Sequence, residues 1–231
     1  MTHPSYRGQG LFPLLAGSLY TRLAAEGYSA VWGFPNSQSH RGFIRDLGWL
    51  DVCEIPMLRC ELASTPAAAE SSSPATPRGT PDARVDRLWQ KLRTRLRVTV
   101  NRRAEHVAWR IRPDSQNHYQ FAALESSSEI RGYTIIKIFG NEVDLVDIEA
   151  EDLDAGRTLL GEIVAAAQAS GSAAINAWLP LRHPLHGEFE RRGFVLSSPV
   201  TYLGVRPLAS ELAELRDPHN WHYSMLDSDV Y

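Results

Sequence analysis

The sequence predicts a mixed α/β fold, an α+β arrangement in which helices cover a partly antiparallel sheet. Apolar residues make up 43% of the 231 residues and charged residues 22%, a balance typical of chains that bury a core. Segments with strand character alternate with segments of helical periodicity. The sequence has no apolar run near the ~20 residues that a membrane helix needs, and its first residues do not resemble a signal peptide.

The N-terminal segment, residues 1–62, predicts a turn, a helix, a strand, a second helix and a second strand. The first helix follows Gly8 and Gly10 and ends near Gly27. Its spacing places four leucines on one face: Leu11, Leu15, Leu19 and Leu23. The later elements of this segment are expected at residues 29–34, 39–47 and 51–62.

Residues 63–83 predict a linker between two folded segments. They hold four prolines and a serine triplet, with almost no large apolar side chain. Such a composition does not bury enough apolar surface to offset the entropy of ordering. The linker separates residues 1–62 from residues 84–208, and residues 209–231 are expected to form a C-terminal tail.

The second segment, residues 84–208, predicts a longer series of elements. It begins with an amphipathic helix, in which Trp89 is expected to lie in the core. A second helix is expected around residues 104–109, with Trp109 also buried. The remaining strands and helices are expected at residues 118–124, 130–138, 142–148, 155–169, 173–179, 185–192 and 194–205.

The stretch from His3 to Phe12 carries the most specific chemical signal. A glycine-rich turn that leads into a helix presents unpaired main-chain N–H groups and the positive end of the helix dipole. Gly8 and Gly10 let the main chain approach an anion, and Arg7 adds a charged contact. The functional interpretation is a phosphate site, and the structural alternative is an ordinary turn at a helix start.

Two motifs in this segment resemble the signatures of the GNAT acetyltransferase superfamily. Arg7-x-x-Gly10-x-Phe12 is similar to its acyl-CoA signature R/Q-x-x-G-x-G/A, with Phe in place of the last small residue. Gly33-Phe34-Pro35-Asn36-x-x-Ser39, followed by Gly42-Phe43, is similar to its second signature, an Asn that begins a helix ending in Gly-Phe. The resemblance covers residues 1–62.

The resemblance implies a GNAT-type N-acetyltransferase with acetyl-CoA as the donor. The acceptor it implies is an amine of a small molecule, with an amino sugar as one candidate. The unprotonated amine attacks the thioester carbonyl directly. The residues implied to bind the cofactor are Arg7, Gly8, Gln9, Gly10, Leu11, Phe12, Asn36 and Ser39.

Two departures from the superfamily pattern concern catalysis. Members often carry a proton-donating Tyr in the helix after the Asn, and Phe43 or Ile44 takes its place here. The superfamily fold also has strands and helices before its phosphate loop, whereas this chain begins at the loop. We therefore expect the N-terminal part of a first acetyltransferase domain to be missing. The catalytic residues are unassigned, with His40 as one candidate base.

Residues 84–208 also resemble this fold, so a second GNAT-like domain is expected. The expected short helix near residues 185–192 leads into Arg192-Gly193-Phe194, and this ending is similar to Leu47-Gly48-Trp49 in the first segment. Where a phosphate loop should follow the strand that ends near Ile148, residues 149–154 hold four carboxylates. Because these would repel a pyrophosphate, we expect the second domain to be free of cofactor.

A basic segment supports a second functional hypothesis. Residues 84–112 hold ten Lys or Arg against two carboxylates, a charge of +8 in 29 residues of a chain whose net charge is −3. The segment predicts either a polyanion site or a solvated helix face paired with residues 149–154. The alternative function is thus a non-catalytic scaffold or polyanion-binding module, although the net charge argues against a dedicated nucleic-acid partner.

The remaining candidate groups predict structural roles. The pairs His183/His186 and His219/His222 have no evident further ligands in the sequence, so no metal is expected. Asp227 and Asp229 are expected to be solvated in the tail. The two cysteines, Cys53 and Cys60, lack a CxxC spacing, which fits a reducing cytoplasm. A strand edge left unpaired in residues 1–62 predicts self-association as a homo-oligomer, with no membrane partner.

Overall fold

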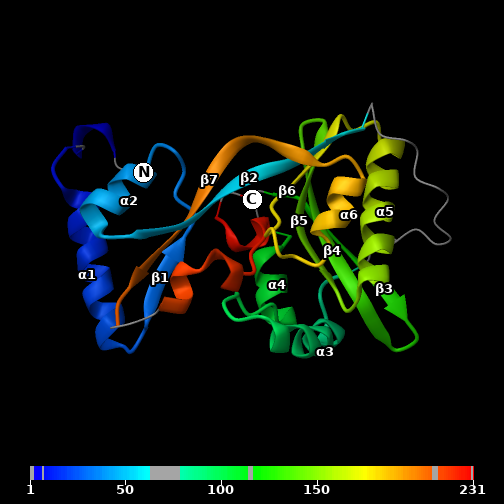
Figure 1. Cartoon of the computed structure of the whole chain (residues 1–231), viewed down its shortest axis with the longest axis horizontal. Helices are drawn as coiled ribbons and strands as arrows, with labels where there is room; N and C mark the ends of the chain where they lie inside the picture. Colours follow the sequence, from blue (N-terminus) through cyan, green and yellow to red (C-terminus); the bar gives the residue numbers. More distant parts are fainter. Residues whose placement is uncertain (1–2, 7, 63–78, 114–116, 210–212, 230) are drawn as a thin grey trace. The chain divides into compact units, whose positions relative to one another are not determined.

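A computed structural model describes residues 3–6, 8–62, 79–113, 117–209, 213–229 and 231. The chain forms two compact units, and each unit is assembled from two segments of sequence (Figure 1). Unit 1 is Met1–Ile55 with Pro199–Asn220, and unit 2 is Pro56–Ser198 with Trp221–Tyr231. This division differs from the contiguous segments 1–62 and 84–208 expected from the sequence, because the end of the last strand pairs with the first strand.

Unit 1 is built around that pairing. β1 (Ala30–Gly33) is antiparallel to the end of β7 (Val195–Pro207). α1 (Leu11–Ala25) precedes β1 along the chain, and α2 (His40–Leu47) follows it. The first half of β2 (Leu50–Glu61) also belongs to this unit. The expected order of helix, strand, helix and strand in this part of the chain is confirmed.

The core of unit 1 forms around Trp49. Its side chain is buried, and its indole Nε1 donates a hydrogen bond to the Tyr20 hydroxyl at 2.9 Å. The Phe43 ring meets the indole edge-on, with ring centroids 4.6 Å apart. α1 therefore contacts the core through Tyr20, while Leu15 and Leu19 of the expected leucine face are 69% and 40% exposed.

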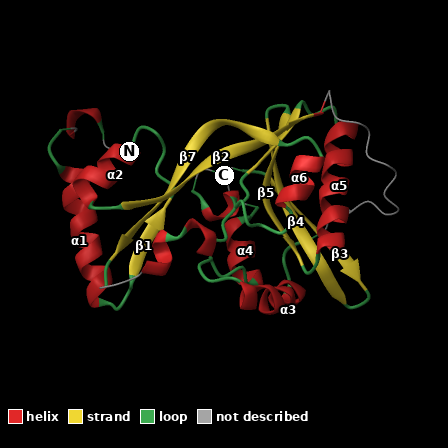
Figure 2. Ribbon diagram, in the orientation of Figure 1, coloured by secondary structure: helices red, strands yellow, loops and turns green. Residues whose placement is uncertain are grey.

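Unit 2 contains the larger part of the sheet (Figure 2). The hydrogen-bonded strand order of the sheet is β1-β7-β2-β6-β5-β4-β3. The pair β5–β6 is parallel, and the pairs β1–β7, β2–β6, β3–β4 and β4–β5 are antiparallel. The strands introduced here are β3 (Tyr119–Ser126), β4 (Glu129–Phe139), β5 (Glu142–Ala150) and β6 (Ala174–Ala177). The β5–β6 pairing ends at Leu145 and Ala177, whereas β5 continues to Ala150, so the two strands part at this point.

The helices of unit 2 contact two faces of this sheet. α5 (Leu153–Ala169) and α6 (His186–Arg191) pack on one face in a core that includes Ile148 of β5. Successive side chains of a strand point to opposite faces. Asp147 and Glu149 accordingly face the side of α3 (Ala83–Leu92) and α4 (Ala104–Arg110).

The mixed α/β fold class and the expected elements of residues 84–205 are confirmed, whereas three local expectations are wrong. Trp109 is 60% exposed rather than in the core. Asp227 is not solvated, because its carboxylate binds a fully buried arginine. The end of the expected tail is likewise part of the core, with Trp221 and Met225 buried. Residues 63–78 of the expected linker lie outside the described residues, and α3 begins at the end of that linker, with Asp82 as its N-cap.

An ion pair joins three strands of unit 2 and predicts a loss of stability in acid. Arg59 of β2 binds both carboxylate oxygens of Glu142 on β5 at 2.8 Å and Asn176 of β6 at 3.0 Å. The hydrogen bonds from Arg59 and Asn176 lower the pKa of Glu142 from 4.5 to about 2. Since the folded pKa is the lower one, this stabilisation is complete above pH 4.5 and is lost as the pH falls towards 2.

Glu142→Gln is therefore expected to lower the free energy of unfolding at pH 7 by about 1 kcal/mol, and to flatten its decline between pH 5 and 2. Urea denaturation across this range measures both effects. Glu61→Gln is the matched control, because Glu61 binds the same Arg59 but is 56% exposed in its side chain. Parallel pH profiles for the wild type and Glu142→Gln would contradict the prediction.

Candidate functional site

The loop before α1 in unit 1 exposes a row of main-chain N–H groups. Gly8 and Gly10 have φ angles of 75° and 69°, the left-handed region that favours glycine, and Gly10 is the N-cap of α1. The N–H groups of residues 8–12 donate no hydrogen bond to another described residue. They lie at the positive end of a 15-residue helix, which is the arrangement that attracts an anion. Arg7 lies outside the described residues.

The second sequence motif forms the start of α2. The Asn36 side-chain oxygen accepts hydrogen bonds from the Ser39 N–H at 3.0 Å and the Ser39 hydroxyl at 3.1 Å. Asn36 and Ser39 thus shape the turn into the helix. The rings of Phe12 and Phe43 meet edge-on at 5.3 Å, so the two motifs lie together where α1 contacts α2. The Phe that replaces a small residue in the first motif forms this contact.

His40, at the first position of α2, contacts Asp51 and Tyr202 within unit 1. Its Nε2 lies 2.6 Å from an Asp51 carboxylate oxygen. Its ring stacks on Tyr202 of β7, with centroids 3.8 Å apart and planes 11° from parallel. A carboxylate and an aromatic ring therefore fix the orientation of this imidazole, as general bases require.

Five of the ten basic residues of the segment 84–112 form ion pairs with described carboxylates of unit 2: Arg84, Arg87, Lys91, Arg102 and Arg103. Arg84 pairs with Asp82 and Glu125, and Arg87 pairs with Glu129. Two further pairs join the segment to acidic residues as the sequence suggested: Lys91 with Glu151 and Arg102 with Glu149. These contacts favour the structural interpretation of residues 84–112 over a free polyanion surface.

A buried charge cluster occupies the face of β5 opposite α5. Arg102 is fully buried, and its guanidinium lies 3.2 Å from Asp147, 3.1 Å from Glu149 and 2.8 Å from Asp227. Burial lowers the pKa of Arg102, but the three carboxylates outweigh it and hold the pKa well above its usual value. Burial raises the pKa of Asp147, whose oxygen also accepts the Tyr133 hydroxyl at 2.9 Å.

Two histidines continue this cluster. His222 Nε2 lies 2.6 Å from Glu149 Oε1, and the His222 ring stacks on the His183 ring at 5.4 Å. Burial favours the neutral acid, but His222 and then Arg102 outweigh it and lower the pKa of Glu149 to about 2. Burial, with His222 nearby, lowers the pKa of His183 to about 3, so its imidazole is neutral at neutral pH.

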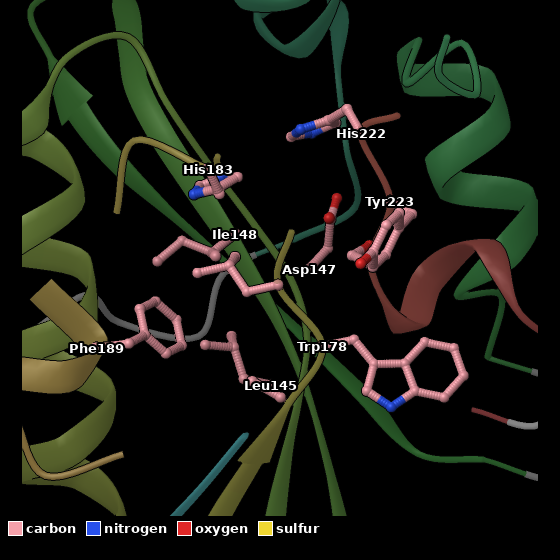
Figure 3. Close-up of a pocket in the computed structure, with 11 residues that line it drawn as sticks. Leu145, Asp147, Ile148, Trp178, His183, Phe189, His222 and Tyr223 are labelled. Atoms are coloured by element: carbon pink, nitrogen blue, oxygen red, sulfur yellow. The ribbon is translucent and has the colours of Figure 1, made fainter. Parts of the chain in front are cut away.

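A small pocket opens between these histidines and the point where β5 and β6 part (Figure 3). Its volume is about 10 Å³, which is room for about one water molecule. In the close-up, His183 and His222 lie at one end and Leu145 and Trp178 at the other. The pocket therefore has a polar end that belongs to the charge cluster and an apolar end that belongs to the core.

Sequence reasoning missed this cluster. It placed Glu149 in an acidic loop after a strand, whereas β5 includes Glu149 and ends at Ala150. The available signal was the alternation of Asp147 and Glu149 with Ile148, which marks a strand with one charged face. The residues assembled here that the sequence left without a functional role are Arg102, Asp147, Glu149, His183, His222 and Asp227.

Comparison with solved structures identifies the fold. A GCN5-related N-acetyltransferase from Anabaena variabilis matches with a TM-score of 0.64 and 12% identity over 89% of this chain. A probable N-acyltransferase from Enterococcus faecalis matches with a TM-score of 0.61 and 16% identity over 90% of this chain. A GCN5-related N-acetyltransferase from Kribbella flavida matches with a TM-score of 0.60 and 16% identity, also over 90% of this chain. The chain spans about half the length of these proteins: 53%, 52% and 51%.

Sequence comparison alone gives no such match. No family model and no curated protein matches the chain. Separately, no helix among the described residues combines the length and the apolar character that crossing a membrane requires.

At identities of 12–16% the likeness to solved structures establishes the architecture, and the chain therefore has the fold of the GCN5-related N-acetyltransferases.

Proposed function

We propose that the chain is an acyltransferase that binds acetyl-CoA at the head of α1 and transfers the acetyl group to an amine of a small molecule. The observation that carries the proposal is the set of N–H groups of residues 8–12, which donate no hydrogen bond to another residue that the structure describes. Gly8 and Gly10 have left-handed conformations, and the space beside them is open, since a Cβ at either position would contact nothing within 4 Å. Such a cradle suits the pyrophosphate of coenzyme A.

The proposed reaction needs one base and no covalent enzyme intermediate. The acceptor ammonium gives a proton to the base, and the free amine attacks the thioester carbonyl. The C–N bond forms, the C–S bond breaks, and the second amine proton goes to the coenzyme A thiolate. His40 is the candidate base in unit 1, because Asp51 at 2.6 Å and the stacked Tyr202 ring fix the orientation of its imidazole.

Calorimetric titration with acetyl-CoA tests the cofactor site. We expect micromolar binding by the wild type and at least tenfold weaker binding by Gly10→Glu, which places a carboxylate where the phosphates would lie. Gly17→Glu is the matched control: it adds the same charge to the same helix, at an exposed glycine with nothing within 4 Å of a Cβ. Absence of binding by the wild type, or equal loss in both variants, would count against the proposal.

His40→Asn tests the proposed base separately. It is expected to reduce kcat at least tenfold and to leave acetyl-CoA affinity unchanged, because His40 acts on the acceptor proton rather than on the cofactor phosphates. The assay follows thiol release from acetyl-CoA with a panel of primary amines, amino sugars included. A His40→Asn variant with unchanged kcat would remove His40 from the mechanism while leaving the cofactor site standing.

A further inference from the structure

We propose that Glu149, His183 and His222 form a binding site for a divalent transition-metal ion of the Zn²⁺ type. The three residues come from separate parts of unit 2: β5, the loop between β6 and α6, and the segment that follows Asn220. One ligand atom from each lies within 4.8 Å of the other two. Two imidazoles and one carboxylate are a ligand set that transition metals use when they keep open coordination positions.

The geometry requires only small movements to accept the ion. Zn²⁺ lies about 2.0–2.2 Å from nitrogen and oxygen ligands, so tetrahedral ligand atoms are about 3.4 Å apart. His222 Nε2 and Glu149 Oε1 are 2.6 Å apart and would separate by less than an ångström. His183 is the third ligand, and its ring already stacks beside that of His222.

The surroundings of the three residues carry an excess of acid groups. Among the described residues, Arg102 faces the carboxyl groups of Asp147, Glu149 and Asp227, and His222 faces Glu149. A divalent cation held by Glu149 and the neutral imidazoles of His183 and His222 would add positive charge beside these three carboxyl groups. Arg102 stays in hydrogen-bonding range of Glu149 at 3.1 Å, and ligating carboxylates in metal sites are commonly held by such outer partners.

The pocket supplies the remaining coordination position. His183 and His222 both line it, and its volume of about 10 Å³ has room for about one water molecule beside the ion. His183 Nδ1 accepts a hydrogen bond from the Leu185 N–H at 3.2 Å. Ligation through Nε2 moves the ring proton to Nδ1 and breaks this one local bond, which is a small loss against a new metal–nitrogen bond.

Titration with Zn²⁺ after chelator treatment tests the site on the full chain. We expect one equivalent to bind with a Kd of micromolar or below, measured by competition with a chromogenic chelator, and to raise the melting temperature. His183→Asn and His222→Asn are each expected to weaken binding at least 100-fold. The controls are His186→Asn and His219→Asn, the second members of the two His-x-x-His pairs, which lie outside the ligand set and should leave the affinity unchanged.

A spectroscopic measurement keeps the proposal testable where a variant folds poorly. Co²⁺ bound to the wild type is expected to give the visible absorption of a tetrahedral nitrogen–oxygen site, and Zn²⁺ should remove it. Failure of the wild type to bind one equivalent, or binding that survives in the His183→Asn, His222→Asn double variant, overturns the proposal. The outcome is independent of acetyl-CoA binding in unit 1, since neither readout uses the transferase reaction.

Discussion

Arg102→Met is expected to lower the free energy of unfolding by about 3–5 kcal/mol. The guanidinium is fully buried between Asp147, Glu149 and Asp227 and also donates to the Ser224 hydroxyl at 3.1 Å. Met fills a similar volume but leaves Asp147 and Asp227 buried without their cation, while Glu149 keeps only its contact with His222. Removing one partner of a buried ionic group costs much more than the group contributes in net terms.

The sign of the pH dependence separates this cause from simple loss of packing. Without Arg102 the buried carboxylates bind protons more readily than in the unfolded chain, so acid should favour the folded variant. The deficit relative to the wild type is therefore expected to shrink as the pH falls from 7 to 5, measured by urea denaturation. Arg97→Met, at an exposed position of the same basic segment, is the control and should change the free energy by less than about 0.5 kcal/mol. A pH-independent deficit would assign the effect to packing.

Gly132→Ala is expected to lower the free energy of unfolding by about 2–3 kcal/mol. A Cβ at Gly132 of β4 would lie 2.6 Å from the Glu149 carbonyl oxygen, 3.1 Å from Ala150 Cα and 2.7 Å from a Leu159 methyl group. Two of these neighbours are main chain of the paired strand and do not move without disturbing the β4–β5 ladder. A substitution of one methyl group should thus displace the strand that carries Glu149.

Thermal and urea unfolding measure this cost, with Gly187→Ala as the matched control. Gly187 lies in α6 of the same unit, and a Cβ there meets only Arg191 at 3.7 Å, an ordinary contact. Alanine in a helix is favoured over glycine by about 0.5–1 kcal/mol, so this variant should be slightly stabilised. Equal effects of the two substitutions would show that the β4–β5 ladder yields to the added methyl group.

The order of helices and strands could be predicted because periodicity and turn residues act locally. The expected helix at 155–169 and strand at 130–138 correspond to α5 and β4 within two residues at each end. The side of a helix that becomes buried depends instead on distant partners. The leucine spacing of α1 gave no indication that Trp49 would draw Tyr20 into the core, and Trp109 satisfied helical spacing yet lies exposed.

The two candidate sites differ in how far the sequence could reveal them. The glycine turn at 8–12 is local, so its open N–H groups could be anticipated from a few adjacent residues. The second site depends on contacts across long separations: Glu149 meets His222 73 residues later, and Arg102 meets Asp227 125 residues later. The spacing of these residues along the chain does not predict such pairs, because they form only when the C-terminal segment packs against the sheet of unit 2.

The interleaving of the two units determines how this protein would respond to being cut. The backbone crosses from one unit to the other after Ile55, after Ser198 and after Asn220. Cleavage within residues 63–83 would divide the chain into two pieces that stay paired through β1–β7 and β2–β6, and each piece would contain an incomplete part of both units. Neither piece alone would therefore contain a complete unit, so we expect neither to fold independently.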